Sequence, residues 1–327
     1  QFIIKSLPIK EIILNKIKNG DLNILPYVMD YACGTGHFLT EIMEEINTII
    51  KDDLSEEKFL MSVDKKLKSW KDYEFSWADE FIYGMDLDYR LIKASKISCF
   101  LNGDGKANLI HANGLAPFNN ADYIKKLKTE TIVQENPQFD ILIANPPYSV
   151  DEFGKHALTN GSECFELFSE LTEKSSAIEC FFVERAKQLV KEGGYVGIVL
   201  PVSLLTNDKI YTKTREILLK YFDIKGILSL HENAFMATNT KTVVLFMQRR
   251  NNSYWENINK YVKEFFVNYK DVAVVGIEKI FSKYVQLSYE DLYFDDYISI
   301  LKNNPSELAK KSDLYKYYEI NGIENTK

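Results

Sequence analysis

The sequence is poor in the residues that define metal-binding and disulfide-rich proteins. Its four cysteines and four histidines lie far apart, and no two cysteines form a CxxC pair. Such a pattern contains neither a zinc-ligand spacing nor a disulfide framework. We therefore expect no bound metal, and free cysteines fit a reducing cytoplasm.

Targeting and membrane-spanning segments are missing as well. The most apolar stretch, residues 195–205, is too short to cross a bilayer and is typical of a core strand. The opening residues QFIIKSLPIKEIIL include Lys5 and Lys10, and no small-residue cleavage site follows, so they form no signal peptide. We predict a cytoplasmic protein that does not bind membranes. The absent initiator methionine indicates that the chain begins inside a longer protein.

Positive charge is scarce. The net charge is −7, whereas tight binding to duplex DNA depends on clustered Lys and Arg. The basic stretches at 65–71, 123–128 and 209–221 are interpreted as solvated helix faces. A stand-alone nucleic-acid binder is therefore disfavoured. No G-x-x-x-x-G-K-[ST] loop occurs either, so ATP binding is not supported.

What the sequence does contain is a regular alternation of strands and helices. Apolar runs predict strands at residues 24–30, 81–86, 108–111, 140–144, 195–200, 227–231 and 242–247. Helical periodicity predicts helices at residues 36–51, 88–101, 177–191 and 209–221, with a helical surface insertion at 52–76. This alternation indicates an α/β fold with a mostly parallel sheet and helices on both faces.

The stretch MDYACGTGHFL, residues 29–39, follows the first predicted strand and opens a helix. Gly34 and Gly36 let the backbone turn tightly and let a ligand approach the chain closely. Asp86, at the end of the second strand, can accept hydrogen bonds from both ribose hydroxyls of a nucleoside cofactor. The interval from Gly36 to Asp86 exceeds the usual roughly 20 residues, which the 52–76 insertion explains. A lone G-x-G also fits an ordinary strand–helix turn.

Asp30 separates two kinds of nucleoside cofactor. Its carboxylate precedes the glycines, where it would repel a pyrophosphate and attract an ammonium group. S-adenosylmethionine carries adenosine, a sulfonium and an amino-acid head. Asp30 therefore favours S-adenosylmethionine over a dinucleotide.

A second informative stretch, ILIANPPYSV at residues 141–150, ends the fourth predicted strand. Asn145-Pro146-Pro147 stops the strand because proline lacks an N–H group, and each proline keeps the residue before it extended. In open α/β sheets ligands bind just past the carboxyl ends of strands. The alternative interpretation is a plain strand-terminating turn.

Together with Asp86, these two stretches resemble the adenine-specific amino-methyltransferases of DNA. The chain is most similar to the modification (M) subunit of type I restriction-modification systems and to related fused restriction-modification enzymes. The similarity runs from residue 1 to about 250 and includes residues 175–201 and 232–247. It implies a Rossmann-like methyltransferase fold with a seven-stranded sheet whose last strand is antiparallel. The implied activity is methyl transfer from S-adenosyl-L-methionine to the exocyclic amino group (N6) of adenine in DNA.

The resemblance also implies roles for individual residues. Cofactor binding is expected from Phe2, Asp30, Ala32, Cys33, Gly34, Thr35, Gly36, Phe38, Met85, Asp86, Leu87, Asn113, Gly114 and Leu115. In this set the loop from Asp30 to Gly36 would line the methionine end, Asp86 would hold the ribose, and Met85 and Leu87 would touch the adenine. Catalysis is expected from Asn145, Pro146, Pro147 and Tyr148, with Tyr148 and Phe235 stacking on the two faces of the target base.

Three positions depart from the family pattern. Ile4 and Lys5 stand where the family usually has Thr and Pro beside the carboxylate of the cofactor. Asn113 stands where the family usually has Asp beside the adenine amino group, although Asn still accepts a hydrogen bond. These departures predict weakened contacts to the cofactor.

Asn-Pro-Pro-Tyr suits an exocyclic amino group because that nitrogen is a poor nucleophile whose lone pair is delocalised into the ring. The side-chain oxygen of Asn145 and the carbonyl of Pro146, aimed at its two hydrogens, would favour a pyramidal nitrogen. Such electrostatic preorganisation needs no strong general base. The adenine must be flipped out of double-stranded DNA, and Tyr148 offers it a stacking face.

Two alternatives remain open. Asn-Pro-Pro-Tyr also occurs in enzymes that methylate the N5 amide nitrogen of glutamine in proteins, although their cofactor loop usually lacks the Ala-Cys pair before Gly-x-Gly. A methyltransferase-like scaffold without activity, which only holds other restriction-modification subunits, would account for the departures at Ile4, Lys5 and Asn113.

The domain organisation follows from the extent of the resemblance. Residues 1–250 are predicted to form the methyltransferase catalytic domain, and residues 251–327 a C-terminal extension packed on it. Nothing in 251–327 has the size of a target-recognition domain. We therefore expect a specificity subunit or a fused target-recognition domain as a partner.

Overall fold

The computed structural model describes residues 1–54, 58–101, 103, 107–120, 123, 125–128, 135–159, 164–230, 240–274 and 276–321. The chain divides into two compact units, Gln1–Asn251 and Asn252–Lys327, and each has a hydrophobic core of its own. In the ranges just given, no helix has both the length and the apolar character needed to cross a membrane.

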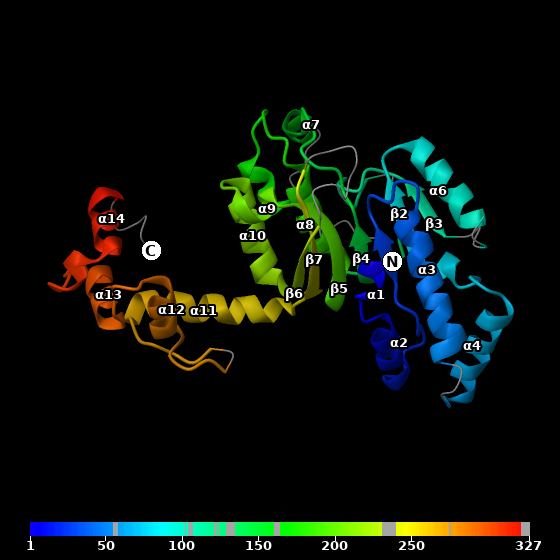
Figure 1. The fold of residues 1–327 in the computed structure, drawn as a ribbon, viewed down its shortest axis with the longest axis horizontal. Coiled ribbons are helices and arrows are strands. Elements are labelled where there is room, and N and C mark those ends of the chain that lie inside the picture. The colour runs from blue at the N-terminus through cyan, green and yellow to red at the C-terminus, as the bar shows by residue number, and fades with distance from the viewer. Residues whose placement is uncertain are drawn as a thin grey trace. The chain divides into compact units, whose positions relative to one another are not determined.

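The first unit is built on one seven-stranded sheet (Figure 1). Its strands are β1 Val28–Asp30, β2 Ile82–Asp86, β3 Asn108–His111, β4 Phe139–Ala144, β5 Val190–Pro201, β6 Phe222–Ser229 and β7 Thr242–Arg249. Their order in the sheet is β3-β2-β1-β4-β5-β7-β6. β7 is antiparallel to both of its neighbours, β5 and β6. The other five strands, in the order β3-β2-β1-β4-β5, are all parallel to their neighbours in that series. The predicted seven-stranded, mostly parallel sheet with an antiparallel last strand is confirmed.

Helices cover both faces of this sheet. They are α1 Phe2–Lys5, α2 Ile9–Lys18, α3 His37–Thr48, η1 Ile49–Asp53, α4 Met61–Asp72, α5 Ala78–Phe81, α6 Tyr89–Leu101, α7 Phe153–Thr159, η2 Glu166–Glu170, α8 Ile178–Leu189, α9 Ser203–Thr206 and α10 Ile210–Tyr221. The crossovers through α3 and α6 lead one way along the sheet, and those through α8 and α10 lead the other way. Because parallel crossovers are right-handed, these two pairs lie on opposite faces. Within each pair the helices pack against each other.

Several strand boundaries differ from the prediction, and the fifth strand, for example, begins at Val190 where residue 195 was predicted. The first strand begins at Val28 and not at residue 24, because Pro26 has no N–H group to offer a ladder. The backbone N–H of Tyr27 donates instead to Oδ2 of Asp140 at 2.8 Å. The sixth strand spans Phe222–Ser229, where residues 227–231 were predicted, and an irregularity between Ile224 and Gly226 breaks its apolar pattern.

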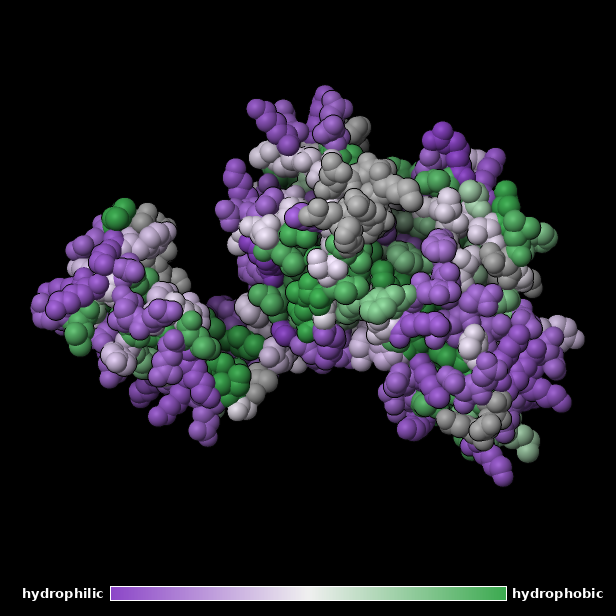
Figure 2. Space-filling model, in the orientation of Figure 1, coloured by the Kyte–Doolittle hydropathy of each residue, from purple (hydrophilic) through white to green (hydrophobic). Residues whose placement is uncertain are grey.

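The predicted insertion at 52–76 contains α4. The buried side chain of α4 is Leu67. Figure 2 shows mainly hydrophilic residues on the surface over α4 and α2. The helix before the insertion ends in the π-helical segment η1, so the predicted helix at 36–51 is continuous but not uniform. The insertion therefore lengthens the connection between β1 and β2 without altering their parallel pairing.

The strand order reverses between β1 and β4, which lie side by side at the centre of the sheet. Successive strands move away from β1 toward β3, and away from β4 toward β5. Both central strands are buried, so the chain reaches the surface only at their ends. The reversal creates a crevice outside the carboxyl ends of these strands, where ligands bind in open α/β sheets.

The second unit is helical. Its elements are α11 Asn252–Asn268, α12 Ile280–Ser288, α13 Phe294–Leu301, η3 Ala309–Lys311 and α14 Asp313–Asn321. Phe265 stacks on Phe281 with ring centroids 3.9 Å apart at the centre of its core. The packing of this segment on the catalytic domain stays a prediction.

Candidate active site

The glycine loop leaves β1 at Asp30 and enters α3 at Gly36. Gly34 (φ +54°) and Gly36 (φ +83°) both have left-handed backbones, which favour glycine. A Cβ at Gly36 would lie 2.3 Å from Oγ of Ser95 on α6, whereas a Cβ at Gly34 would meet nothing within 4 Å. Gly36 therefore permits close packing of two helices, and Gly34 leaves open space in which a ligand can approach the backbone.

Asp86 joins the glycine loop to the end of β2. Its Oδ2 accepts the backbone N–H of Gly34 at 2.9 Å, and its Oδ1 accepts the N–H of Asp88 at 2.8 Å. The N–H of Cys33 also donates to the carbonyl of Met85 at 2.9 Å. An ionised carboxylate has about four acceptor positions, so Asp86 keeps acceptor capacity for a further donor.

Asp30 is a buried acid beside the same loop. Its side chain is 1% exposed, and its Oδ1 accepts the N–H of Ala32 at 3.1 Å. Burial raises the pKa of Asp30 from 3.8 to about 8. Within the described ranges Asp30 forms no salt bridge, so the site presents a buried carboxyl group that an arriving cation would stabilise in its ionised form.

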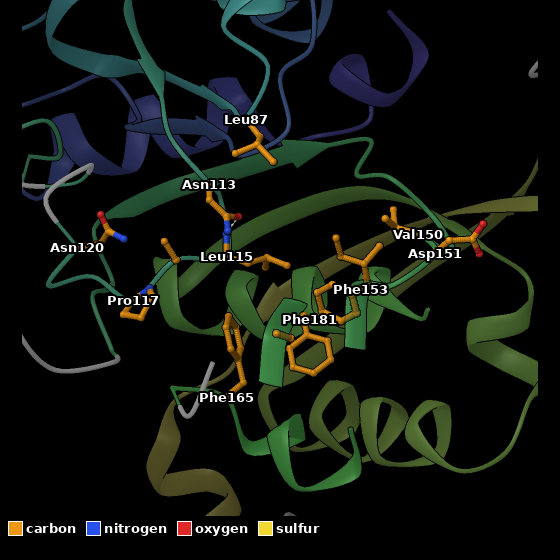
Figure 3. A pocket seen from close by; sticks show the side chains of 13 residues that line it. Leu87, Asn113, Leu115, Pro117, Asn120, Val150, Asp151, Phe153, Phe165 and Phe181 are labelled. Carbon is orange, nitrogen blue, oxygen red and sulfur yellow. Dashed lines mark hydrogen bonds between the residues drawn. The ribbon is translucent and has the colours of Figure 1, made fainter. Parts of the chain in front are cut away.

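A pocket of about 630 Å³ lies next to the end of β2, where Leu87 follows Asp86 (Figure 3). Its lining is mainly apolar and comprises Leu87, Asn113, Leu115, Ala116, Pro117, Asn120, Val150, Asp151, Phe153, Ala157, Phe165, Ile178 and Phe181. Oδ1 of Asn113 accepts the N–H of Leu115 at 3.0 Å, which fixes the turn after β3. The volume and the apolar walls with few polar groups are those of a small-molecule site.

The Asn-Pro-Pro-Tyr loop begins directly after the last buried residue of β4. Asn145 and Pro147 are exposed, Pro146 is buried and Tyr148 is half-buried. The hydroxyl of Tyr148 donates to the side-chain oxygen of Asn145. Val150 and Asp151, a few residues further on, line the same pocket as Leu87 and Asn113. The loops after β1, β2, β3 and β4 therefore meet at one edge of the sheet.

Comparison with known proteins assigns the chain to a family. The model of the family "N-6 DNA Methylase" matches residues 9–293. The chain belongs to this family. The resemblance seen in the sequence is thereby confirmed.

Two curated relatives of this chain are longer proteins. It is 26% identical over 291 residues to the type II restriction enzyme and methyltransferase RM.Eco57I of Escherichia coli, a match that covers 79% of this chain. It is 22% identical over 228 residues to the type II restriction enzyme and methyltransferase RM.BcgI of Heyndrickxia coagulans, covering 69% of this chain. The match spans 28% of the length of each relative.

Among solved structures, the M protein of the type I restriction enzyme EcoKI is similar to this chain with a TM-score of 0.46. The two chains are 19% identical, and the match covers 70% of this chain and 40% of that one.

The structure brings some of the predicted cofactor residues together and separates others. Leu87, Asn113 and Leu115 line the pocket. The side chain of Met85 is 1% exposed and lies in the core. A Cβ on the buried Gly114 would approach the carbonyl oxygen of Tyr31 to 2.5 Å, so close packing against the β1 loop requires glycine there.

The other predicted cofactor residues, in the glycine loop and at the start of α3, differ in their exposure to solvent. Thr35 is exposed, while Ala32 and Phe38 are half-buried. Cys33 is buried, and burial followed by the charges of the two nearby acids raises the pKa of its thiol well above its usual range. It therefore stays protonated at neutral pH.

The N-terminal segment forms the short helix α1. Phe2 is 63% exposed and does not line the pocket, whereas Ile4 is buried in the main core. Lys5 is exposed. Phe235, the second predicted stacking residue, lies outside the described residues.

Sequence reasoning missed several residues that shape the site. Phe153, Phe165 and Phe181 form one wall of the pocket (Figure 3), and the rings of Phe153 and Phe181 contact each other with centroids 5.1 Å apart. Glu179, on the first turn of α8, was missed too. Phe181 and Glu179 belong to the stretch 175–201 that carried part of the family resemblance, so the signal was present without an assigned role.

Proposed function

We propose that this chain transfers a methyl group from S-adenosyl-L-methionine to the N6 amino group of adenine in DNA, as the modification part of a restriction-modification system. One observation carries the proposal: the strand reversal places the glycine loop after β1 beside the Asn-Pro-Pro-Tyr loop after β4. A pocket at the same edge of the sheet is lined by residues that follow β2, β3 and β4. Membership of the N-6 DNA methylase family supports methyl transfer to DNA.

The chemistry of the loops fits S-adenosylmethionine. The buried Asp30 has no cationic partner in the described part of the chain and suits the ammonium group of the amino-acid head. Asp86 suits the ribose hydroxyls, and the open space at Gly34 admits the ligand close to the backbone. Leu87 and Leu115 offer apolar contacts for the adenine ring in the adjoining pocket. When bound, the cofactor supplies an electrophilic methyl group.

Asn145 and Tyr148 suit the target base. The Asn145 oxygen accepts a hydrogen bond from the Tyr148 hydroxyl, so it is turned toward space beside the tyrosine ring and not into the core. A hydrogen of the adenine amino group takes the place of the hydroxyl hydrogen when the base stacks on that ring. The prolines hold the acceptors rigid, so little reorganisation accompanies the chemical step.

The proposed partners are double-stranded DNA with one adenine flipped out, and a specificity subunit or fused target-recognition domain. The net charge of −7 leaves much of the DNA contact to that partner. The two curated relatives are named restriction enzymes as well as methyltransferases. No metal is required by this chemistry, and no group of three His, Cys, Asp or Glu in the described ranges is placed to hold one.

Two measurements test the proposal. Calorimetry with S-adenosylmethionine should show binding at one site, which an inactive scaffold without a cofactor site would lack. Tritium from labelled cofactor should appear in DNA as N6-methyladenine and not in protein, with the partner that supplies sequence recognition present in the assay. Transfer to protein glutamine instead would overturn the choice of substrate, and absence of cofactor binding would overturn the activity altogether.

A further inference from the structure

A buried glutamate lies behind the Asn-Pro-Pro-Tyr loop. Glu179 is on the first turn of α8, and its side chain is 0% exposed. Its Oε2 accepts the backbone N–H of Ser149, the residue that follows Tyr148, at 3.0 Å. Its Oε1 accepts the hydroxyl of Tyr211 on α10, also at 3.0 Å. Both oxygens of one carboxylate are therefore used to connect a loop and two helices.

The residue that Glu179 holds has an unusual backbone. Ser149 has φ +47°, in the left-handed region that residues with a Cβ seldom adopt. Such a conformation persists only where the surroundings impose it. A second tether lies further along, where the N–H of Gly154 donates to the carbonyl of Ser175 at 2.7 Å. The loop after β4 is thus restrained by the segment that leads into α8.

Tyr211 in turn orients the glutamate. Burial and the nearby charge of Glu179 raise the pKa of Tyr211 well above its usual range, so its hydroxyl stays protonated and donates to Oε1 of Glu179. A chain of hydrogen bonds therefore runs from α10 through Tyr211 and Glu179 to the loop after β4.

The residue type matches the task. Two donors from different elements converge on Glu179, and an ionised carboxylate accepts from both because it carries two acceptor oxygens. An apolar residue would leave the Ser149 N–H without its partner at a cost in stability. Glutamine keeps one acceptor oxygen, so it can still hold Ser149 while its NH2 group meets the Tyr211 oxygen.

We propose that Glu179 is a positioning residue for methyl transfer: by holding Ser149 it keeps the Asn145 oxygen and the Pro146 carbonyl aimed at the target amino group. This inference rests on the proposed function for its catalytic consequence. Glu179 touches neither the base nor the cofactor in this assignment. Its effect should therefore fall on the chemical step, which depends on the placement of the acceptors to within about an ångström.

Single-turnover methylation at saturating DNA and cofactor measures that effect. Glu179→Ala should lower the rate constant at least about tenfold and leave the dissociation constant for S-adenosylmethionine within about threefold. Glu179→Gln should restore most of the rate, because its amide oxygen can accept the Ser149 N–H. The rate constant of Tyr211→Phe should lie between those of these two variants. This substitution frees one carboxylate oxygen of Glu179 but leaves its hydrogen bond with Ser149. Equal losses in the Ala and Gln variants, or a loss confined to cofactor affinity, would overturn the positioning role.

Hydrogen exchange over residues 145–152 tests the tether without any activity. Glu184→Ala is a matched control, because Glu184 lies on the same helix, is equally buried, and accepts the backbone N–H groups of Glu166 and Leu167 instead. Exchange in 145–152 should quicken at least about tenfold in Glu179→Ala and stay unchanged in Glu184→Ala. Unchanged exchange in the first variant, or equal acceleration in both, would overturn the inference. If the wild type fails to methylate DNA, the proposed function falls, while the exchange result still decides whether Glu179 restrains the loop after β4.

Discussion

Replacing Asp30 by Asn should stabilise the protein relative to the wild type, by an amount that grows as the pH rises. The same substitution damages the proposed cofactor site. The folded protein keeps the Asp30 carboxyl protonated up to about pH 8, because burial raises its pKa from 3.8 to about 8. The unfolded chain ionises the same group near pH 4. Between these values the folded state binds more protons, so wild-type stability falls as the pH rises.

The structure gives the size of the effect. One proton of difference corresponds to about 1.4 kcal/mol of unfolding free energy per pH unit. From pH 5 to pH 7 the advantage of Asp30→Asn over the wild type should therefore grow by roughly 3 kcal/mol. The amide oxygen of Asn can still accept the N–H of Ala32, so the local turn is preserved. Other titrating groups are shared by both proteins and cancel in the difference.

Urea unfolding at pH 5, 6 and 7 measures this difference. Trp77 is buried in the first unit and Trp255 belongs to the second, so a Trp255→Phe background lets fluorescence report the first unit. Asp88→Asn is a suitable control: hydrogen bonds from Arg90 lower the pKa of Asp88 to about 2, and it is ionised in both states over this range. A difference for Asp30→Asn that stays flat from pH 5 to pH 7, as expected for the control, would refute the reasoning.

Further substitutions separate the proposed roles of the other site residues. Asn145→Ala removes one acceptor that matters as the amino nitrogen pyramidalises, and should lower single-turnover methylation at least about a hundredfold; a calorimetric cofactor affinity that falls equally would contradict this role. Asp86→Ala removes an acceptor for the ribose, and should raise the cofactor dissociation constant roughly ten- to a hundredfold in calorimetry; an unchanged constant would exclude Asp86 from the site. Tyr148→Phe keeps the stacking ring and loses only the hydroxyl that contacts Asn145, so its rate should stay within about tenfold of the wild type, and a loss as large as that of Asn145→Ala would assign the hydroxyl a direct role. Gly36→Ala adds a Cβ that meets Ser95 and should cost about 2–4 kcal/mol in thermal unfolding, whereas Gly34→Ala meets no atom and should cost about 1 kcal/mol; equal costs would contradict the packing around Gly36.

The fold was predictable because its signals are local. Each strand of a buried parallel sheet is a short apolar run, and β3 begins and ends at the predicted residues, Asn108 and His111. The boundaries that failed depend on partners far away in the sequence. Tyr27 leaves the ladder to bind Asp140, and the strand at Phe222 continues through an irregularity that only its pairing with β7 reveals.

The site was predictable in part for the same reason. The glycine loop, Asp86 and Asn145 each lie at the end of a strand, so sequence order and the rules of open sheets place them at one edge. The side chains that complete the site come from elements whose faces the sequence leaves undefined. Nearly every residue of α8 is buried, charged ones included, so its apolar periodicity did not distinguish Phe181, which lines the pocket, or Glu179, which holds the loop.

The central pairing of β1 with β4 has a consequence for how the protein folds. The contact of Tyr27 with Asp140 closes a sequence separation of 113 residues, and such long-range pairings form slowly because loop closure must precede any gain in contacts. A nascent chain that ends near residue 120 already contains the glycine loop and Asp86, but one edge of β1 has no neighbouring strand. Unpaired strand edges of this kind promote aggregation during synthesis. We expect the glycine loop and the Asn-Pro-Pro-Tyr loop to become ordered in a single late step, so that incomplete chains lack the proposed site.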